Sequence, residues 1–382
     1  MGKIKFEPVP WVLLGVVTLG YGIYIPWFGL YGDDWIYMWA NHLLGPTFLI
    51  DFVAVDRPFS AWIYVLTGAV FGEHVWAYHV LMLLLRWLSA VLLWWVFRMV
   101  WPKQIRPLTW VAIFFALYPG FQQQPISLQF ILHFSSLALF LLSLGLMIQA
   151  VQRPARGRWL TVAAVASQVV SLFSVEYFFG LEFLRPVILW WTLKDKIDET
   201  RTRLRQVLLK WLPYLVALVG YLYWRVFVFE FPTYQPRLLE GFSAEPFKAA
   251  LLFVVRMLRD FRLVTYGAWR QVFSLPEEGQ YILPGVGIIL ASAALLIFFM
   301  SRYPKRHREE ADSARLHWKD WSVQGLLFGV AALVLGGMPI WIAEIPLELV
   351  FPWDRSTLSF MFGISFALVA LVYLIIRSPF RV

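Results

Sequence analysis

Apolar residues occur along this chain in long runs that are separated by short polar segments. A run of about 20 apolar residues is long enough to cross the hydrocarbon core of a bilayer as a helix. The run at 107–120 is the shortest and predicts a short or half-buried helix. The pattern predicts an all-α polytopic membrane protein with about ten transmembrane helices. The ten runs cover residues 10–29, 75–97, 107–120, 127–151, 159–174, 177–193, 207–229, 283–301, 323–343 and 359–376.

Lysine and arginine residues are distributed unevenly between the two sets of connecting segments. With the N-terminus placed inside, the inner segments hold 22 of the 33 basic residues and 8 acidic residues. The outer segments and the spans together hold 11 basic and 16 acidic residues. Because cytoplasmic loops carry an excess of Lys and Arg, we expect a multi-pass protein of the plasma (inner) membrane with both termini cytoplasmic. Pro26-Trp27-Phe28 follows the first run in place of a small-residue cleavage site, so we expect an uncleaved anchor.

Two outer segments, 30–74 and 230–282, are rich in aromatic residues mixed with charge. Within them, the pattern of apolar and charged residues at 34–44 and at 246–275 is typical of amphipathic helices that lie in the membrane interface. A passive surface helix is the alternative for both. The chain is therefore expected to comprise a transmembrane module at 1–229, an outer loop with an amphipathic helix at 230–282, and C-terminal transmembrane helices at 283–382.

The composition agrees with a membrane protein and excludes several other classes. Hydrophobic residues make up 60% of the chain and charged residues 15%, against about 25% charged in an ordinary soluble domain. A soluble fold of this size could not bury that much apolar surface. A soluble enzyme, a disordered protein and a nucleic-acid-binding domain are thus excluded. Because the chain has no cysteine, disulfides and thiolate metal sites are excluded as well.

The first candidate site is the acidic pair Asp33-Asp34, which follows the first apolar run on the outer side. Adjacent carboxylates repel each other, so a partly dry site raises the pKa of one of them unless a cation lies nearby. Such a pair can provide a general base, or it can bind a divalent cation such as Mg or Mn. The structural alternative is a helix N-cap at the start of the interfacial helix.

Other charged residues on the outer side form a second group of candidates. Arg57 and Arg355 each follow an aspartate, Asp56 and Asp354, and guanidinium groups suit phosphate recognition. A local ion pair is the alternative for Asp56-Arg57. The remaining outer candidates for substrate or phosphate binding are His79, Glu176, Arg225 and Arg237.

Some polar residues within the apolar runs have a simpler structural explanation. Glu182 and Arg185 are three positions apart on a helix, which predicts an internal salt bridge. His79 and His133 are each more often structural residues than ligands. Arg86 lies in the middle of a run and must therefore face protein, water or a carboxylate partner.

An acidic pair and phosphate-binding arginines on one side of a membrane suit a reaction on a sugar carried by a polyprenyl phosphate. The leaving phosphate is already anionic and needs no proton, so one carboxylate base suffices. Cationic groups hold the departing phosphate. Such a site requires neither ATP nor a nucleotide sugar, and a divalent cation is compatible with it but not required.

The order and spacing of these motifs resemble a known family over about residues 10–190. The motifs are Asp33-Asp34-Trp35, Asp56-Arg57-Pro58-Phe59, Phe71-Gly72, His74-Val75-Trp76-Ala77-Tyr78-His79, Ala116-Leu117-Tyr118-Pro119-Gly120, the stretch from Gln122 to Pro125, and Ser174-Val175-Glu176. In this order they resemble the GT-C glycosyltransferases of the protein-mannosyltransferase and aminoarabinose-transferase kind. Unlike many members, this chain has no soluble C-terminal domain.

The resemblance implies that residues 1–229 are a catalytic module and that the protein is an inverting glycosyltransferase. An aspartate of the first outer loop is the family's base, which implies Asp33 or Asp34 here. A late outer arginine contacts the lipid phosphate, and Arg355 is its nearest counterpart. The expected partners are a polyprenyl-phosphate sugar donor, a glycan, lipid or protein acceptor, and membrane lipids, with no nucleic acid. The alternatives are a transporter or flippase of lipid-linked sugars, a polytopic membrane acyltransferase that would use His79 or His133, and a scaffold without catalysis.

Overall fold

The computed structural model describes residues 7–229, 245–274, 279, 282–306 and 308–375, and only the backbone of residues 300–320. Every element in these ranges is a helix. The α-helices are α1 (Val9–Val17), α2 (Asp34–Leu44), α3 (Phe48–Ala54), α4 (Ala61–Phe71), α5 (Val75–Val100), α6 (Ile105–Ala116), α7 (Ser127–Gln152), α8 (Gly157–Ser174), α9 (Arg185–Lys194), α10 (Thr200–Tyr223), α12 (Pro246–Arg262), α13 (Ala268–Arg270), α14 (Ile282–Arg306), α15 (Arg308–Ile342) and α16 (Met361–Ile375). Short 3-10 or π segments are η1 (Thr18–Gly22), η2 (Ile25–Trp27), η3 (Pro154–Arg156), η4 (Glu176–Leu184), η5 (Trp224–Val228), η6 (Leu263–Gly267), η7 (Gln271–Phe273) and η9 (Trp353–Phe360).

Seven helical stretches among the described residues are long and apolar enough to cross a membrane, so the predicted class of α-helical polytopic membrane protein is confirmed. They are Val9–Trp27, Val75–Val100, Ser127–Gln152, Thr200–Val228, Ile282–Phe299, Trp321–Ile342 and Trp353–Ile375. The other three predicted spans are also helical, but they do not belong to this set.

Each of these three segments differs from a regular apolar span in a specific way. The segment at 107–120 forms α6, which has only 12 residues. The segment at 159–174 forms α8, in which Arg158 and Gln168 lower the mean hydropathy. The segment at 177–193 is divided at Arg185 into the 3-10 helix η4 and the ten-residue α9. The total of ten spans therefore stays a prediction.

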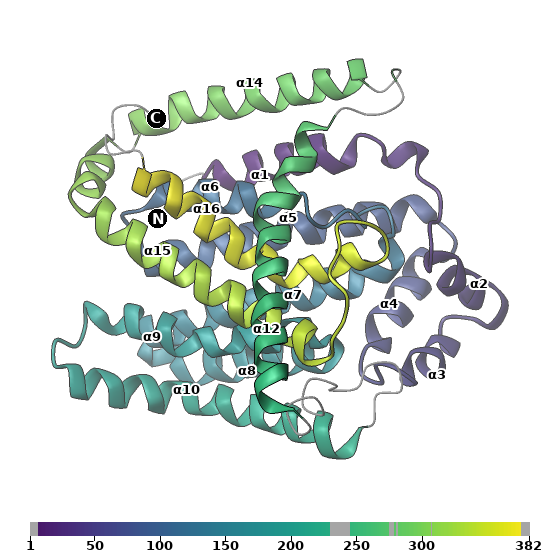
Figure 1. Ribbon diagram of the computed structural model, residues 1–382, viewed down its shortest axis with the longest axis horizontal. Coiled ribbons are helices and arrows are strands. Elements are labelled where there is room, and N and C mark those ends of the chain that lie inside the picture. The colour runs from purple at the N-terminus through teal and green to yellow at the C-terminus, as the bar shows by residue number, and fades with distance from the viewer. Residues whose placement is uncertain (1–6, 230–244, 275–278, 280–281, 307, 376–382) are drawn as a thin grey trace.

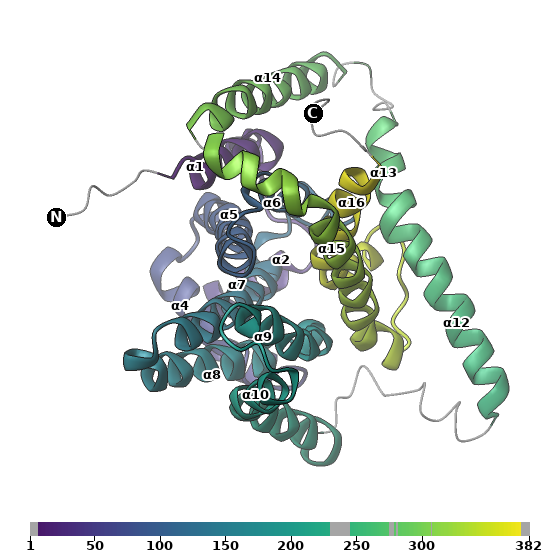
Figure 2. The same ribbon diagram turned by 90° about the vertical axis from the view of Figure 1, so that its left-hand side faces the viewer.

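The long helices run side by side, and α7 is at the centre of the bundle. Its residues are mostly buried, and it packs along α5 on one side and α8 on the other. Figure 1 shows α2, α3 and α4 grouped at one end of the bundle, whereas the turn between α9 and α10 lies at the opposite end. Figure 2 looks nearly along the bundle and shows α15 and α16 apart from the group formed by α8, α9 and α10.

Glycines allow the backbone of α15 to pack directly against the backbones of neighbouring helices. A Cβ atom on Gly363 of α16 would lie 2.6 Å from the backbone nitrogen of Leu333 in α15. A Cβ on Gly180 of η4 would lie 1.9 Å from the carbonyl oxygen of Leu335. Small residues permit this kind of close packing between membrane helices. We call the contacts of α15 with α16 and η4 the glycine seam.

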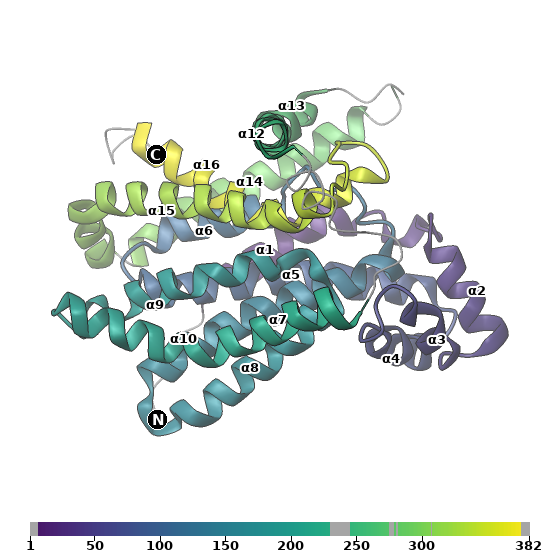
Figure 3. The same ribbon diagram turned by 60° about the horizontal axis from the view of Figure 1, so that its bottom comes forward.

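Helix α12 runs across the bundle instead of along it. It crosses the view in Figure 1 and is seen end-on in Figure 3, where α7, α10 and α15 run across the picture. Its buried residue Asp260 accepts a hydrogen bond of 3.0 Å from the indole nitrogen of Trp341 in α15. Arg256 donates to the carbonyl oxygen of Ile345 at 2.6 Å. Most of its apolar side chains remain exposed, so α12 presents an apolar face to the surroundings of the protein.

The charged residues deep in the bundle are fully engaged by protein groups. Arg86 donates to the carbonyl oxygen of Ala116 at 2.7 Å, to Gln124 at 3.0 Å and to the hydroxyl of Tyr21 at 2.8 Å. Of the three surroundings predicted for Arg86, the structure shows protein. No described carboxylate forms an ion pair with it.

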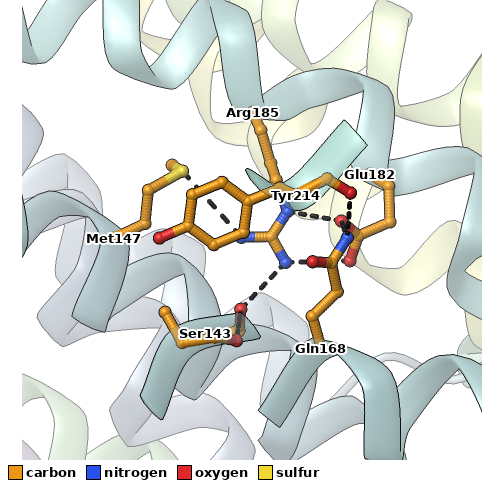
Figure 4. A network of polar contacts seen from close by, with 7 residues as sticks. Ser143, Met147, Gln168, Glu182, Arg185 and Tyr214 are labelled. Carbon is orange, nitrogen blue, oxygen red and sulfur yellow. Dashed lines mark hydrogen bonds and ion pairs between the residues drawn. The ribbon is translucent and has the colours of Figure 1, made fainter. Parts of the chain in front are cut away.

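The predicted salt bridge between Glu182 and Arg185 is confirmed. Figure 4 shows both side chains in a network with Gln168, Ser143 and Tyr214. Gln168 donates to Glu182 at 2.6 Å, and Arg185 donates to the hydroxyl of Ser143 at 3.0 Å. Both charged residues are buried, so this pair is a structural connection between α7, α8 and the start of α9.

Candidate active site at one end of the bundle

The acidic pair lies where the first connecting segment meets the N-terminal end of α7. Gly32 has a φ of 53°, which is in the left-handed region that favours glycine, and the turn it forms starts α2 at Asp34. The Asp34 side chain is fully buried and accepts a hydrogen bond of 3.0 Å from the backbone nitrogen of Gln129. Asp34 thus satisfies one of the unpaired amides at the start of a long helix.

The two aspartates have different environments. Burial raises the pKa of Asp34 to about 7, although backbone amides of Gln129, Leu128 and Ser127 oppose the shift. Asp33 is the residue before α2, and its side chain is exposed. The pair therefore comprises one carboxylate that a substrate can reach and one that is enclosed by protein.

Gln129 connects Asp34 to the aromatic and imidazole groups beside it. Its carbonyl oxygen accepts a hydrogen bond from the hydroxyl of Tyr64 at 3.4 Å and is 3.3 Å from Nδ1 of His133. The ring of Tyr64 stacks on that of Tyr37 with a centroid distance of 4.7 Å. Helices α2, α4 and α7 therefore meet at one hydrogen-bonded cluster.

Arg57 and Glu176 form a bidentate ion pair beside this cluster, since the ring of Tyr177, the next residue, lies 5.0 Å from that of His133. Arg57 donates to both oxygens of Glu176, at 3.0 and 2.6 Å. About a fifth of each side chain is exposed. Burial raises the pKa of Glu176, but the charge and hydrogen bonds of Arg57 outweigh this effect and lower it to about 2. The Arg57 guanidinium at this site is therefore held in an orientation that Glu176 sets.

Charge interactions place Asp33 and Arg355 around the same cluster. The charges of Arg57 and Asp33 both act on Tyr37, together with that of Asp56. The charges of Arg57, Glu176 and Arg355 all act on His133. Charged residues from four distant parts of the sequence are therefore close enough to influence the rings of Tyr37 and His133.

Asp354 and Arg355 have separate roles in η9. Asp354 is buried and accepts hydrogen bonds from the backbone nitrogen of Gln122 at 2.9 Å and from the side chain of Gln123. These hydrogen bonds connect η9 to the segment between α6 and α7. The guanidinium of Arg355 lies 5.5 Å from the ring centroid of Trp353, and its side chain is half-buried.

Two other predicted site residues, His79 and Arg225, make contacts with backbone carbonyls outside this cluster. His79 is buried, and its Nε2 lies 3.0 Å from the carbonyl oxygen of Gly29, which indicates a packing role. Arg225 donates to the carbonyl oxygen of Phe229, and its charge acts, like that of Glu176, on Tyr221. Arg237 lies outside the described residues.

Several residues of the cluster were not predicted from the sequence. Tyr37, Tyr64 and Gln129 carry no charge, and their contacts join segments that are far apart in the chain. The alternation of aromatic and polar residues in 30–74 was the only signal that pointed to the two tyrosines. Gln122 and Gln123 belong to a motif that the sequence did single out, and the structure shows that they hold Asp354.

The described residues contain no group of three or more His, Asp or Glu side chains placed to hold a metal ion. Asp33 and Asp34 supply at most two carboxylates, and one oxygen of Asp34 is engaged by the backbone of α7. A divalent cation at this pair would therefore need ligands from a substrate or from water.

Fold and site together define an α-helical polytopic membrane protein with a polar cluster at one end of its bundle. Comparisons with protein-family models, with curated proteins and with solved structures found no match. The assignment of a function to this class of protein therefore depends on the chemistry of the cluster.

Proposed function

We propose that this protein is an inverting glycosyltransferase that moves a sugar from a polyprenyl-phosphate donor to an acceptor. The observation that carries the proposal is exposed Asp33 next to Asp34, which is bound to the start of α7. On the same helix, the ring of His133 lies 5.0 Å from that of Tyr177, the residue after Glu176, which binds Arg57. A carboxylate that can accept a proton and cations that can hold an anionic leaving group are the two chemical requirements of this transfer. The order of the motifs, which resembles that of GT-C glycosyltransferases, also supports the proposal.

Asp33 is the better candidate for the base because an acceptor hydroxyl can reach it. In the transfer, the acceptor oxygen forms a bond to the anomeric carbon while the bond from that carbon to the phosphate oxygen breaks. The hydroxyl proton goes to Asp33, and the electron pair of the broken bond stays on the departing phosphate. Attack on the face opposite to the leaving group inverts the anomeric carbon.

Asp34 is a positioning residue in this proposal. Its hydrogen bond to the backbone of Gln129 fixes the start of α2 on α7, and this contact sets the direction of the neighbouring Asp33. Arg57, which Glu176 holds in place, and Arg355 stabilise the leaving phosphate. Asp56, Arg225 and Arg237 stay candidates for contacts with the rest of the head group.

The proposed reaction takes place at the outer face of a plasma membrane. The supporting argument is the excess of Lys and Arg in the segments at the opposite end of the bundle. In this arrangement α2 and α12 lie in the interface plane, since both expose apolar side chains, α12 also carries exposed charged residues, and α12 runs across the bundle. The donor's lipid tail then remains in the bilayer while its head group meets the cluster.

The test is a transfer assay with a polyprenyl-phosphate sugar on Asp33→Asn and Asp34→Asn, each purified and checked for folding. We expect Asp33→Asn to lower turnover by about 10²–10⁴-fold, as loss of a general base does. Asp51→Asn, an exposed carboxylate on α3, is the matched control and should keep wild-type turnover. Near wild-type turnover in both variants of the pair would overturn the proposal, and loss only in Asp34→Asn would move the base to Asp34.

A transporter or flippase of lipid-linked sugars is the second candidate, because it could use the same cluster for binding. The polar residues deeper in the bundle do not favour it: Arg86 and the Glu182–Arg185 pair are engaged by protein groups. Reconstituted vesicles distinguish the two functions. Movement of the head group across the bilayer without a new glycosidic bond would support the transporter.

A further inference from the structure

A second polar cavity lies at the end of the bundle opposite to the candidate active site. It has a volume of about 360 Å³ and is enclosed by the last turns of α7, the first turns of α8, and parts of α9 and α10. About 30 Å separates its α7 residues from Gln129, given the rise of 1.5 Å per residue along a helix. The proposed transfer reaction does not use this cavity.

The cavity walls combine apolar and cationic groups. Met147, Val151 and Leu189 provide apolar surface, while Arg158 and Lys210 provide positive charge. Neither cation forms an ion pair with a described carboxylate. A site with two cations and an apolar wall suits a ligand that is itself an anion joined to a hydrocarbon chain.

Hydroxyl groups add hydrogen-bonding capacity between the two kinds of wall. Tyr214 is buried, its hydroxyl has no hydrogen-bond partner among the described residues, and Thr161 also lines the cavity. Figure 4 shows this hydroxyl directed away from the Glu182–Arg185 network that its ring covers. The ring lies 4.6 Å from the guanidinium of Arg185, so the network fixes Tyr214 in this orientation.

A proline within the continuous helix α10 leaves an additional hydrogen-bond acceptor beside the cavity. Pro213 lies inside α10 and lines the cavity. Because proline has no amide hydrogen, the carbonyl of Leu209, four residues earlier, lacks its usual helical donor. Leu209 lines the cavity as well, so a hydrogen-bond donor of a ligand has a possible partner there.

We propose that this cavity binds the phosphate head group of an anionic phospholipid from the leaflet around this end of the bundle. Basic pockets between membrane helices are suited to anionic head groups. The apolar wall favours a lipid over free phosphate, and α7 and α10 are both candidate membrane spans. Exposed Trp159, next to Arg158, has the amphipathic ring that is enriched where helices enter the interface.

The test measures lipid binding to the detergent-solubilised full chain by native mass spectrometry. The probes are dioleoyl phosphatidylglycerol, dioleoyl phosphatidylcholine and inorganic phosphate. We expect phosphatidylglycerol to bind most tightly and the double variant R158Q/K210Q to weaken its binding at least about tenfold. The matched control R201Q/R205Q removes two exposed cations of α10 at the same end and should keep wild-type affinity.

A second variant tests the cavity without changing its charge. Ala150→Phe places a large side chain on the α7 wall and should also prevent binding of phosphatidylglycerol. Equal losses in R158Q/K210Q and R201Q/R205Q would overturn the proposal, since binding would then depend on general surface charge. Equal binding of phosphatidylcholine, or of inorganic phosphate, would overturn the assignment to an anionic lipid.

Discussion

At the scale of single residues, the most informative feature is the contrast between the two neighbouring aspartates. Asp34 has a pKa of about 7 because the protein encloses it, whereas Asp33 is exposed. The sequence predicted that one carboxylate of the pair would have a raised pKa in a partly dry site, and Asp34 agrees with this. Which of the two is enclosed depends on the contact with Gln129, 95 positions away, and no local pattern contains that information.

The pKa of Asp34 predicts a change of stability with pH. The folded protein keeps the proton of Asp34 up to about pH 7, whereas the unfolded chain loses it near the ordinary value of 3.8. Stability from this group is therefore present below pH 3.8 and is lost as the pH rises to about 7, with a maximum near 4 kcal/mol, an order-of-magnitude figure.

The variant Asp34→Asn cannot ionise, so it should gain stability relative to the wild type as the pH rises from 5 to 8. Thermal unfolding of both proteins in detergent at these two pH values measures the difference. Asp51→Asn is the control, because Asp51 is exposed. A constant difference between Asp34→Asn and the wild type over this range would contradict the prediction.

The ion pair between Arg57 and Glu176 predicts the opposite pH dependence. The pKa of Glu176 is lowered from 4.5 to about 2, so its stabilising effect is present above pH 4.5 and is lost as the pH falls towards 2. A double-mutant cycle with Arg57→Gln and Glu176→Gln should give a coupling energy of about 1–2 kcal/mol at pH 7, since the pair is bidentate but a fifth exposed. The same cycle at pH 3 should give a smaller value.

At the scale of helices, the sequence predicted the boundaries of the apolar segments better than the type of helix that each one forms. The boundaries of α5 and α7 agree with the predicted runs to within a few residues. Hydropathy does not distinguish an α-helix from the 3-10 geometry of η4, because both bury the same side chains. A neighbouring helix explains one residue of η4, since the carbonyl of Leu335 lies where a Cβ at Gly180 would be and only glycine fits there.

The glycine seam yields a prediction with an internal control. A Cβ at Gly363 would approach the backbone of α15 to 2.6 Å, whereas a Cβ at Gly285 in α14 would meet no described atom within 4 Å. Gly363→Ala should therefore destabilise the protein by about 1–3 kcal/mol through overpacking. Gly285→Ala should be neutral or stabilising by up to about 1 kcal/mol, because alanine favours a helix. Thermal unfolding in detergent compares the two variants.

At the scale of the whole molecule, charge predicts which connecting segments share the outer side, and this topology stays a prediction. The contacts among these segments could not be predicted from charge. Arg57 and Arg355 were both predicted as outer residues, but no local pattern indicated that both would lie near His133. Contacts of this kind depend on how helices pack, which hydropathy does not encode. The cavity between α7 and α10 was missed for the same reason.

The orientation of the bundle can be tested because the chain has no native cysteine. Single cysteines at Glu73 and Thr202, exposed residues near opposite ends of the bundle, should react from opposite sides of the membrane. We expect a membrane-impermeant thiol reagent added to intact cells to label Glu73→Cys. It should label Thr202→Cys only after permeabilisation. Labelling of both cysteines in intact cells would contradict the predicted topology.

The glycine seam has a consequence for any anion that contacts Arg57 and Arg355 together. Arg355 lies in η9, the element that comes after α15 in the chain. Glu176, which binds Arg57, is the first residue of η4, on the other side of the seam. We expect the close backbone packing at the seam to restrict movement of α15 against η4, and with it changes in the distance between the two guanidinium groups. A nearly constant spacing of the two guanidinium groups would select anions by their size. The protein would not need to close around the ligand.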